Sequence, residues 1–138
     1  MAFSLNEMAY PIEGIATVAA HSLKKGVTQY RAVDLATGEQ LFLKDLGNQT
    51  VNIGEFLAVV AAAKYIIEHD FYPRVIYTDS ITALTWFANK KTASKKRMSD
   101  LGRAEIFLKI MASKIDNITV IHWNTPLWGE IPADFGRK

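Results

Sequence analysis

The sequence contains no cysteine, only four prolines, and no apolar run long enough to cross a membrane. The absence of cysteine excludes disulfides and thiolate metal sites. It also favours a reducing compartment, so we expect a cytoplasmic protein. The most apolar stretch, residues 56–67, is too short for a membrane span and contains Lys64. The N-terminus has no basic segment followed by an apolar one, so we expect no signal peptide.

An excess of charge of one sign is also missing, because the formal net charge is only +2 over 138 residues. Nearly half of the residues are apolar, 49%, which suits one domain with a hydrophobic core. We expect residues 1–138 to form that domain, with 1–11 as a lead-in segment.

The charge is uneven in one place, where five cations fall within eight residues: Lys90, Lys91, Lys95, Lys96 and Arg97. A basic run on a nearly neutral chain predicts contact with a polyanion. It is equally typical of a solvated helix end followed by a loop. Composition does not decide between the two readings.

Alternating patterns predict three strands, at residues 12–20, 27–35 and 39–44, joined by short turns as an antiparallel meander. The pattern then changes to helical spacing. Asn52 is expected to cap this helix, with Glu55 three residues later in a capping box. The helix is apolar on nearly every side, so we expect it to be deeply buried.

Two more strands are predicted, at residues 74–78 and 117–123, each reached through helical segments. One helix starts at Asp79-Ser80, another starts at Ser99-Asp100, and a short one is expected in the tail from Leu127. The apolar side of the second is expected to consist of Ile106, Phe107, Ile110, Met111 and Ile115. Helical crossovers place the connected strands parallel. The fold class is therefore α/β, a mixed five-stranded sheet with helices on both faces and a strand order left open.

Three carboxylates lie at element boundaries: Glu55, Asp79 and Asp134. Asp79 ends a strand predicted to lie inside the sheet, where ligands bind in open α/β sheets. It could instead only cap a helix, although Ser80 could do so equally well. Glu55 has its capping box as an alternative role, and Asp134 lies in a polar tail where acids are common.

Taken together, the three acids predict a site for divalent cations. Mg²⁺ prefers oxygen ligands, and two such ions can activate a water and stabilise a leaving oxygen in phosphoryl chemistry. Other chemistries lack their motifs. The three histidines show no zinc spacing, no serine lies in a nucleophile elbow, and no glycine loop could cradle a phosphate.

Three segments resemble a bacterial ribonuclease H domain, most of all the Bacteroidetes type. They read Asn-Ile-Gly-Glu-Phe-Leu-Ala from Asn52, Ile-Tyr-Thr-Asp-Ser-Ile-Thr-Ala-Leu-Thr-Trp from Ile76, and Trp-Gly-Glu-Ile-Pro-Ala-Asp-Phe-Gly-Arg-Lys from Trp128. The resemblance runs from about Ile12 to the C-terminus. It implies the ribonuclease H-like fold and an RNA/DNA-hybrid endonuclease that uses two Mg²⁺ or Mn²⁺ ions.

The resemblance also implies roles for individual residues. Glu55, Asp79 and Asp134 match three of the four metal-binding, catalytic acids of the family. Asn52 matches an asparagine that contacts the minor groove of the hybrid. The family also has a region that grips the DNA strand. The residues of this chain that resemble it are Trp86, Lys90, Lys91, Lys95 and Lys96. The expected partner is thus an RNA/DNA hybrid, whereas neither a membrane nor a protein partner is indicated.

The first strand departs from the family pattern, because Val18 stands where the fourth acid is expected. Valine cannot coordinate a cation. Glu13 and His21 would face the other side of the strand, and Asp34 and Glu39 belong to neighbouring segments. The family's histidine before the last acid is also missing. We therefore expect weak or absent metal-dependent cleavage, and the alternative is a non-catalytic module that binds nucleic acid or protein.

Overall fold

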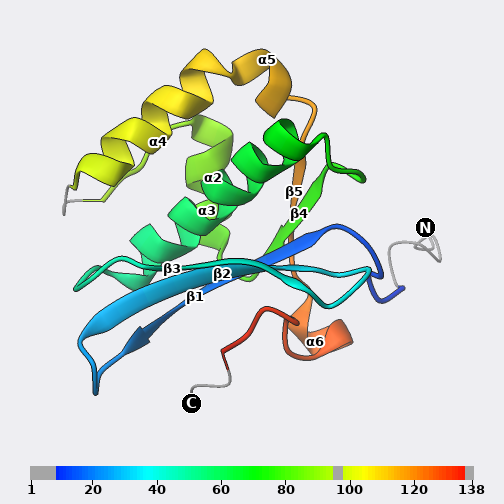
Figure 1. Ribbon diagram of the computed structural model, residues 1–138, viewed down its shortest axis with the longest axis horizontal. Coiled ribbons are helices and arrows are strands. Elements are labelled where there is room, and N and C mark those ends of the chain that lie inside the picture. The colour runs from blue at the N-terminus through cyan, green and yellow to red at the C-terminus, as the bar shows by residue number, and fades with distance from the viewer. Residues whose placement is uncertain (1–8, 95–97, 136–138) are drawn as a thin grey trace.

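A computed structural model describes residues 9–94 and 98–135, which form a five-stranded sheet in the order β3-β2-β1-β4-β5 (Figure 1). The strands are β1 (Ile15–Ser22), β2 (Val27–Asp34), β3 (Gln40–Asp45), β4 (Val75–Thr78) and β5 (Thr119–His122). β1 to β3 form the predicted antiparallel meander, and β4 runs parallel to both β1 and β5. The mixed α/β sheet expected from the sequence is confirmed, and the strand order is now fixed.

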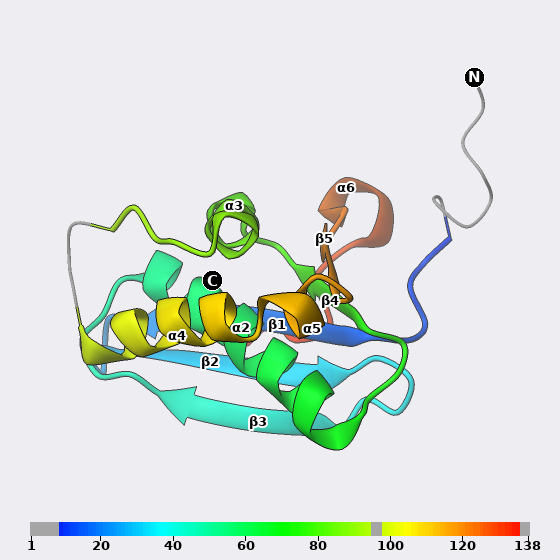
Figure 2. The same cartoon turned by 90° about the horizontal axis from the view of Figure 1, so that it is seen from above.

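The described helices are α2 (Val51–His69), α3 (Ile81–Asn89), α4 (Ser99–Ile110), α5 (Ala112–Ile115) and α6 (Thr125–Trp128). α2 packs on β1, β2 and β4, and both α3 and α4 contact α2 (Figure 2). α6 and the C-terminal segment lie on the opposite side of the sheet from α2 (Figure 1). Within the described ranges, no helix combines the length and apolar character that crossing a membrane requires.

The sheet separates two cores, because consecutive residues of a strand point to opposite faces. The helix-face core lies between the sheet and α2 and includes Ile15 and Ala19 of β1. The tail-face core lies under α6 and the C-terminal segment and consists of Ala16, Val18, Val33, Trp123, Ile131 and Ala133. Adjacent residues of β1 therefore belong to different cores.

Some predicted details of the helices are wrong. Thr50, not Asn52, caps α2, since its side chain accepts a hydrogen bond from the Ile53 amide at 3.3 Å. Asn52 already lies in the first turn, and the carboxyl of Glu55 is used elsewhere, so no capping box forms. The tail helix α6 begins at Thr125, ahead of the predicted position, where Asn124 caps it and Pro126 lies within its first turn.

The predicted apolar side of α4 is also wrong in part. Leu101, Ala104 and Leu108 are its buried residues, while Ile106 and Ile110 are 58% and 74% exposed. α4 packs on α2 rather than on the sheet, so it buries only a narrow stripe. Of the residues expected from the sequence, Ile106 and Ile110 face outward, whereas Ile115 is buried in the helix-face core and Phe107 and Met111 pack against it.

Candidate metal centre

Glu55 and Asp79, two of the three predicted acids, meet at the carboxyl end of β4. Asp79 directly follows the strand, and the cap of α3 is Ser80, whose Oγ accepts a hydrogen bond from the Ala83 amide at 3.0 Å. Asp79 therefore has no capping role. Its carboxyl forms a hydrogen bond with that of Glu55, which reaches it from the first turns of α2. We call these two side chains the acid pair.

The local backbone explains how Glu55 reaches this position. A Cβ on Gly54 would lie 2.8 Å from the Cβ of Ala19 and 2.9 Å from the Cγ2 of Thr28. Only glycine therefore allows α2 to approach β1 this closely. β4 ends at Thr78, opposite Thr17, so β1 continues beyond its parallel partner. There the Ala19 amide donates a hydrogen bond to Oε1 of Glu55.

The electrostatics of the acid pair favour a cation. Glu55 is 5% exposed. Burial raises the pKa of Glu55 to about 10, and the hydrogen bond with Asp79 and the charge of Asp79 act in the same direction. The hydrogen bond from Ala19 lowers the pKa but does not offset these effects. At neutral pH the Glu55 carboxyl therefore keeps its proton, and a divalent cation bound at the acid pair would displace it.

Val18, at the position where the family would have its first acid, lies in an apolar core and pairs with Arg31 across β1 and β2. Val18 is 4% exposed and packs in the tail-face core with Ile131 and Ala133, which are 2% and 0% exposed. His21, on the opposite face, lies 2.8 Å from Thr28 through its Nδ1 atom and cannot replace the acid. Position 18 itself therefore supplies no side-chain oxygen to a cation.

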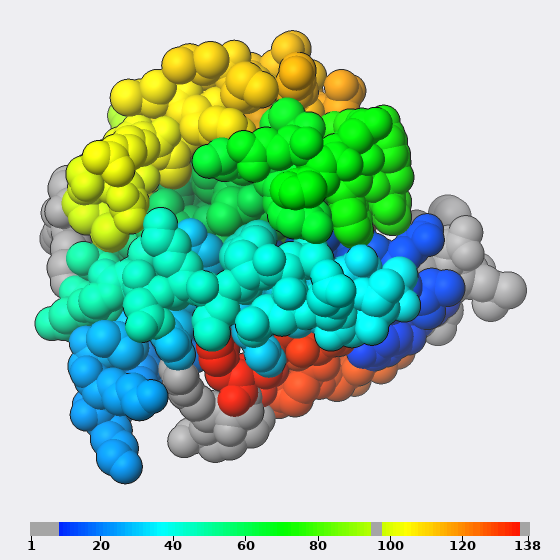
Figure 3. Space-filling view, in the orientation of Figure 1, coloured from blue at the N-terminus to red at the C-terminus, as the bar shows by residue number. Residues whose placement is uncertain are grey.

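Asp134 lies on a segment that Arg31 of β2 holds through the main chain. Nε of Arg31 donates to the carbonyl of Ala133 at 2.6 Å, and a terminal nitrogen donates to the carbonyl of Asp134 at 2.5 Å. The guanidinium also lies 4.8 Å from the ring centroid of Phe135. In Figure 3 this segment, in red, is packed against the cyan strands. Arg31 thus fixes the path of the backbone that carries Asp134.

The three predicted acids do not all converge. Over residues 9–94 and 98–135, no group of three or more His, Cys, Asp or Glu side chains is close enough to hold a metal ion. The structure joins Glu55 to Asp79 and leaves Asp134 outside the pair. The oxygen donors therefore fit one hard divalent cation at the acid pair, and they do not make up a four-acid, two-ion site.

The predicted nucleic-acid contacts have different surroundings. Asn52 is exposed in the first turn of α2, one turn before Glu55, and Lys91 is also exposed. Lys90 ends α3 with a φ of 56°, and its Nζ lies 3.4 Å from Asp116. Lys95 and Lys96 lie outside the described residues.

Trp86 is largely buried. It is 9% exposed and its ring meets Phe56 edge to face, with the ring centroids 5.9 Å apart. The ring belongs to the helix-face core, because α3 turns this side toward α2. Its contact with nucleic acid stays a prediction.

Two contributors to the site were not identified from the sequence. Gly54 could have been found, because a glycine inside a helical pattern often marks close packing. Arg31 carries no local signal, since its partners are the carbonyls of residues 102 and 103 positions later in the chain.

No protein-family model matches the chain. Among solved structures, it is similar to LC11-RNase H1, isolated from compost by a metagenomic approach, with 16% identity and a TM-score of 0.53 over 81% of this chain and 84% of that one. LC11-RNase H1 in complex with an RNA/DNA hybrid gives 15% identity and a TM-score of 0.50 over 81% and 85%. The prototype foamy virus protease-reverse transcriptase gives 20% and 0.53 over 79% of this chain and 17% of that one. The chain has the ribonuclease H-like fold.

Proposed function

We propose that this protein is a member of the bacterial ribonuclease H family, of the Bacteroidetes type, that binds RNA/DNA hybrids and cleaves them weakly or not at all. Val18 takes the place of the first catalytic acid in this proposal. The observation that carries it is the contrast at β1, where the acid pair lies on one side and the apolar Val18 corner on the other. The three sequence motifs and the shared fold support the family assignment.

The acid pair is the part of the machinery that is retained. Glu55 and Asp79 would hold one Mg²⁺ or Mn²⁺, with Glu55 oriented by the Ala19 amide. A divalent ion bound to such a site polarises phosphate oxygens and lowers the pKa of its water. Asp134 serves as a further acid on the segment tied to Arg31. Without an acid at position 18, the family's arrangement of two ions loses the carboxylate expected between them.

Hybrid binding rests on a different set of residues. Asn52 is exposed beside the acid pair, and Lys90 and Lys91 follow α3, with Lys95 and Lys96 beyond them in the sequence. Phosphate contacts by such lysines make affinity fall with salt concentration. The similar structure of LC11-RNase H1 in complex with an RNA/DNA hybrid supports this ligand class. The Val18 corner also favours the second candidate, a non-catalytic nucleic-acid-binding module, which shares this surface and in which Val18→Asp would not restore cleavage.

A cleavage assay on a labelled RNA/DNA hybrid tests the proposal. It compares the native chain, Val18→Asp and the uncharged control Val18→Asn, each with Mg²⁺ or Mn²⁺. We expect little or no cutting by the native chain and by Val18→Asn, and a gain of about 100-fold or more in Val18→Asp, because a ligand of the cation is restored. Thermal unfolding of each variant separates a chemical effect from loss of the fold, since position 18 is buried.

Robust cutting by the native chain would contradict the proposed impairment. If neither the native chain nor Val18→Asp cuts but both bind the hybrid with salt-dependent affinity, the non-catalytic module is supported. Folded proteins that neither cut nor bind would overturn both candidates.

A further inference from the structure

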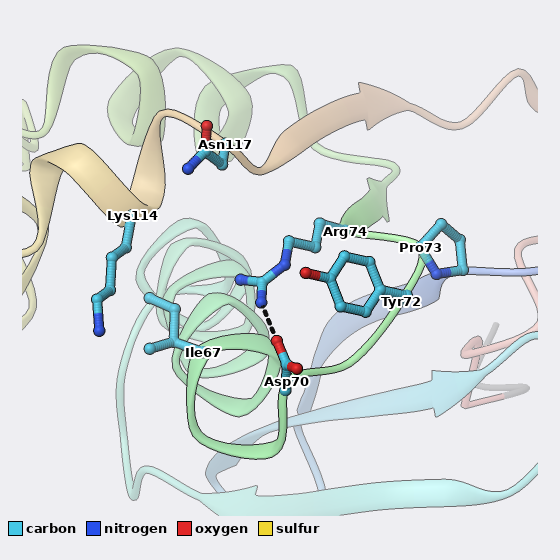
Figure 4. A pocket seen from close by; sticks show the side chains of 7 residues that line it. All are labelled: Ile67, Asp70, Tyr72, Pro73, Arg74, Lys114 and Asn117. Carbon is cyan, nitrogen blue, oxygen red and sulfur yellow. Dashed lines mark hydrogen bonds and ion pairs between the residues drawn. The ribbon is translucent and has the colours of Figure 1, made fainter.

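A groove of about 710 Å³ lies at the end of β4 that is far from the acid pair (Figure 4). Its wall is formed by the end of α2, the segment leading to β4, and the region between α5 and β5. The lining residues are Ile67, Asp70, Tyr72, Pro73, Arg74, Lys114 and Asn117. Arg74 precedes β4 and Asp79 follows it, so at about 3.3 Å per residue the two are roughly 16 Å apart. The groove is thus separate from the candidate metal centre.

Arg74 is held in place on one side of the groove. Its side chain is only 19% exposed, forms an ion pair with Asp70, and lies 4.7 Å from the ring centroid of Tyr72. A guanidinium carries five donors, so the bond to the Asp70 carboxylate leaves others for a ligand. Because its position is already fixed, little side-chain entropy is lost when a ligand binds.

Further donors face Arg74 across the groove. Figure 4 shows Lys114 and Asn117 on the opposite wall, with the apolar Ile67 between the two sides. Lys114 is exposed at the surface of α5, and Asn117 precedes β5. The lining includes two cations, Arg74 and Lys114, against the single acid Asp70, which gives it a net charge of +1. An ammonium, a guanidinium and an amide on facing walls suit an oxygen-rich anion.

We propose that this groove binds the phosphate group of a small phosphorylated compound. Arg74 and Lys114 hold its charge from opposite walls, and Asn117 donates a hydrogen bond. Asp70 is neutralised by Arg74 and keeps the guanidinium in place. Free phosphate and a nucleoside 5′-monophosphate present the same group, and the exposed ring of Tyr72, at 67%, gives the nucleoside a surface to stack on.

Titrations followed by ¹⁵N NMR test the groove directly. Inorganic phosphate and adenosine 5′-monophosphate are added separately to the full chain, without divalent cations and at constant ionic strength set with chloride. We expect saturable shifts at residues 70–74 and 114–117. A lower dissociation constant for the nucleotide identifies the nucleoside as part of the ligand, whereas equal constants identify phosphate alone.

Variants assign the binding to the groove. Lys114→Ala removes one charged hydrogen bond and is expected to weaken affinity by about tenfold or more. Arg74→Lys keeps the charge but loses the planar guanidinium, which can donate two hydrogen bonds to one phosphate. This variant should also weaken binding. Lys109→Ala, an exposed lysine on α4, is the matched control and should leave affinity unchanged.

Three results would overturn the proposal: shifts no larger than those with chloride alone, equal losses in Lys114→Ala and Lys109→Ala, or shifts confined to the region of Glu55 and Asp79. Hybrid binding and cleavage do not enter this test. Its outcome is therefore independent of the proposed function.

Discussion

The two faces of β1 have opposite chemistry at adjacent residues. On the helix face, the Ala19 amide donates to the buried carboxyl of Glu55, which is joined to Asp79. On the tail face, Val18 lies in an apolar core together with Ile131 and Ala133. Because successive residues of a strand face opposite sides, position 18 can change without disturbing the partner of Glu55. An acid pair can thus persist after another corner of the same site has become apolar.

The largest expected effect comes from weakening the tail face. Ile131→Ala removes a side chain that is 2% exposed and packed beside Val18, so the free energy of unfolding should fall by about 2–5 kcal/mol. Ile110→Ala makes the same change at a residue that is 74% exposed and should cost less than about 0.5 kcal/mol. Urea unfolding measures both. Similar small costs would mean that the tail is not a packed layer over Val18.

The second largest effect is expected when α2 is forced away from β1. Gly54→Ala would place a Cβ within 2.8 Å of Ala19 and 2.9 Å of Thr28, so α2 must shift, at a cost of about 1–3 kcal/mol. Gly102→Ala in α4 is the matched control. Nothing lies within 4 Å of its new Cβ, and it should stabilise the protein by about 0.5–1 kcal/mol. If thermal unfolding gave the two variants the same sign, the close approach of α2 to β1 would not be needed.

The last prediction concerns the pH dependence of stability that arises from the buried Glu55 carboxyl. Below pH 4.5 the Glu55 carboxyl is protonated whether the chain is folded or not, and its contribution to stability is complete. As the pH rises above 4.5 the unfolded group ionises, while the folded one keeps its proton up to a pKa of about 10. The contribution is therefore lost progressively as the pH rises through that window. Glu55→Gln mimics the protonated acid and removes the loss.

We expect Glu55→Gln to match the native chain at pH 4 and to be more stable than the native chain at pH 8, in urea unfolding with a chelator present, because the variant has no carboxyl to lose its contribution. Glu68→Gln is the control at the other end of α2. The Glu68 side chain is 55% exposed, and its ion pair with Lys64 is long, at 4.0 Å. Its difference from the native chain should stay within about 0.5 kcal/mol at both pH values. Parallel pH profiles for the two variants would contradict the raised pKa.

Much of the fold follows from local pattern. The meander, the two parallel strands and the long buried helix are all where alternation and helical spacing predict them. The cap of α2 was misassigned because Thr50 and Asn52 are both good capping residues, and the choice depends on the backbone path between β3 and α2. The exposed Ile106 and Ile110 likewise depend on which neighbour α4 finds.

The site was predictable in part. Motifs and element boundaries identified Glu55 and Asp79, and the structure joins them. The same reasoning grouped Asp134 with them, although no set of three acids close enough for a metal occurs among the described residues. The distance between remote side chains depends on tertiary contacts such as that of Arg31 with the tail. Such contacts leave no periodic trace in the sequence.

The contact of Arg31 with the tail also has a consequence for biosynthesis. Its acceptors, the carbonyls of Ala133 and Asp134, follow it by 102 and 103 residues. At a translation rate of about 5–20 residues per second, β2 is synthesised roughly 5–20 s before them. During that interval the apolar surface of Ala16, Val18 and Val33 has no cover from Ile131 and Ala133. The nascent sheet is then open to chaperones and to aggregation until the last of the described residues emerge.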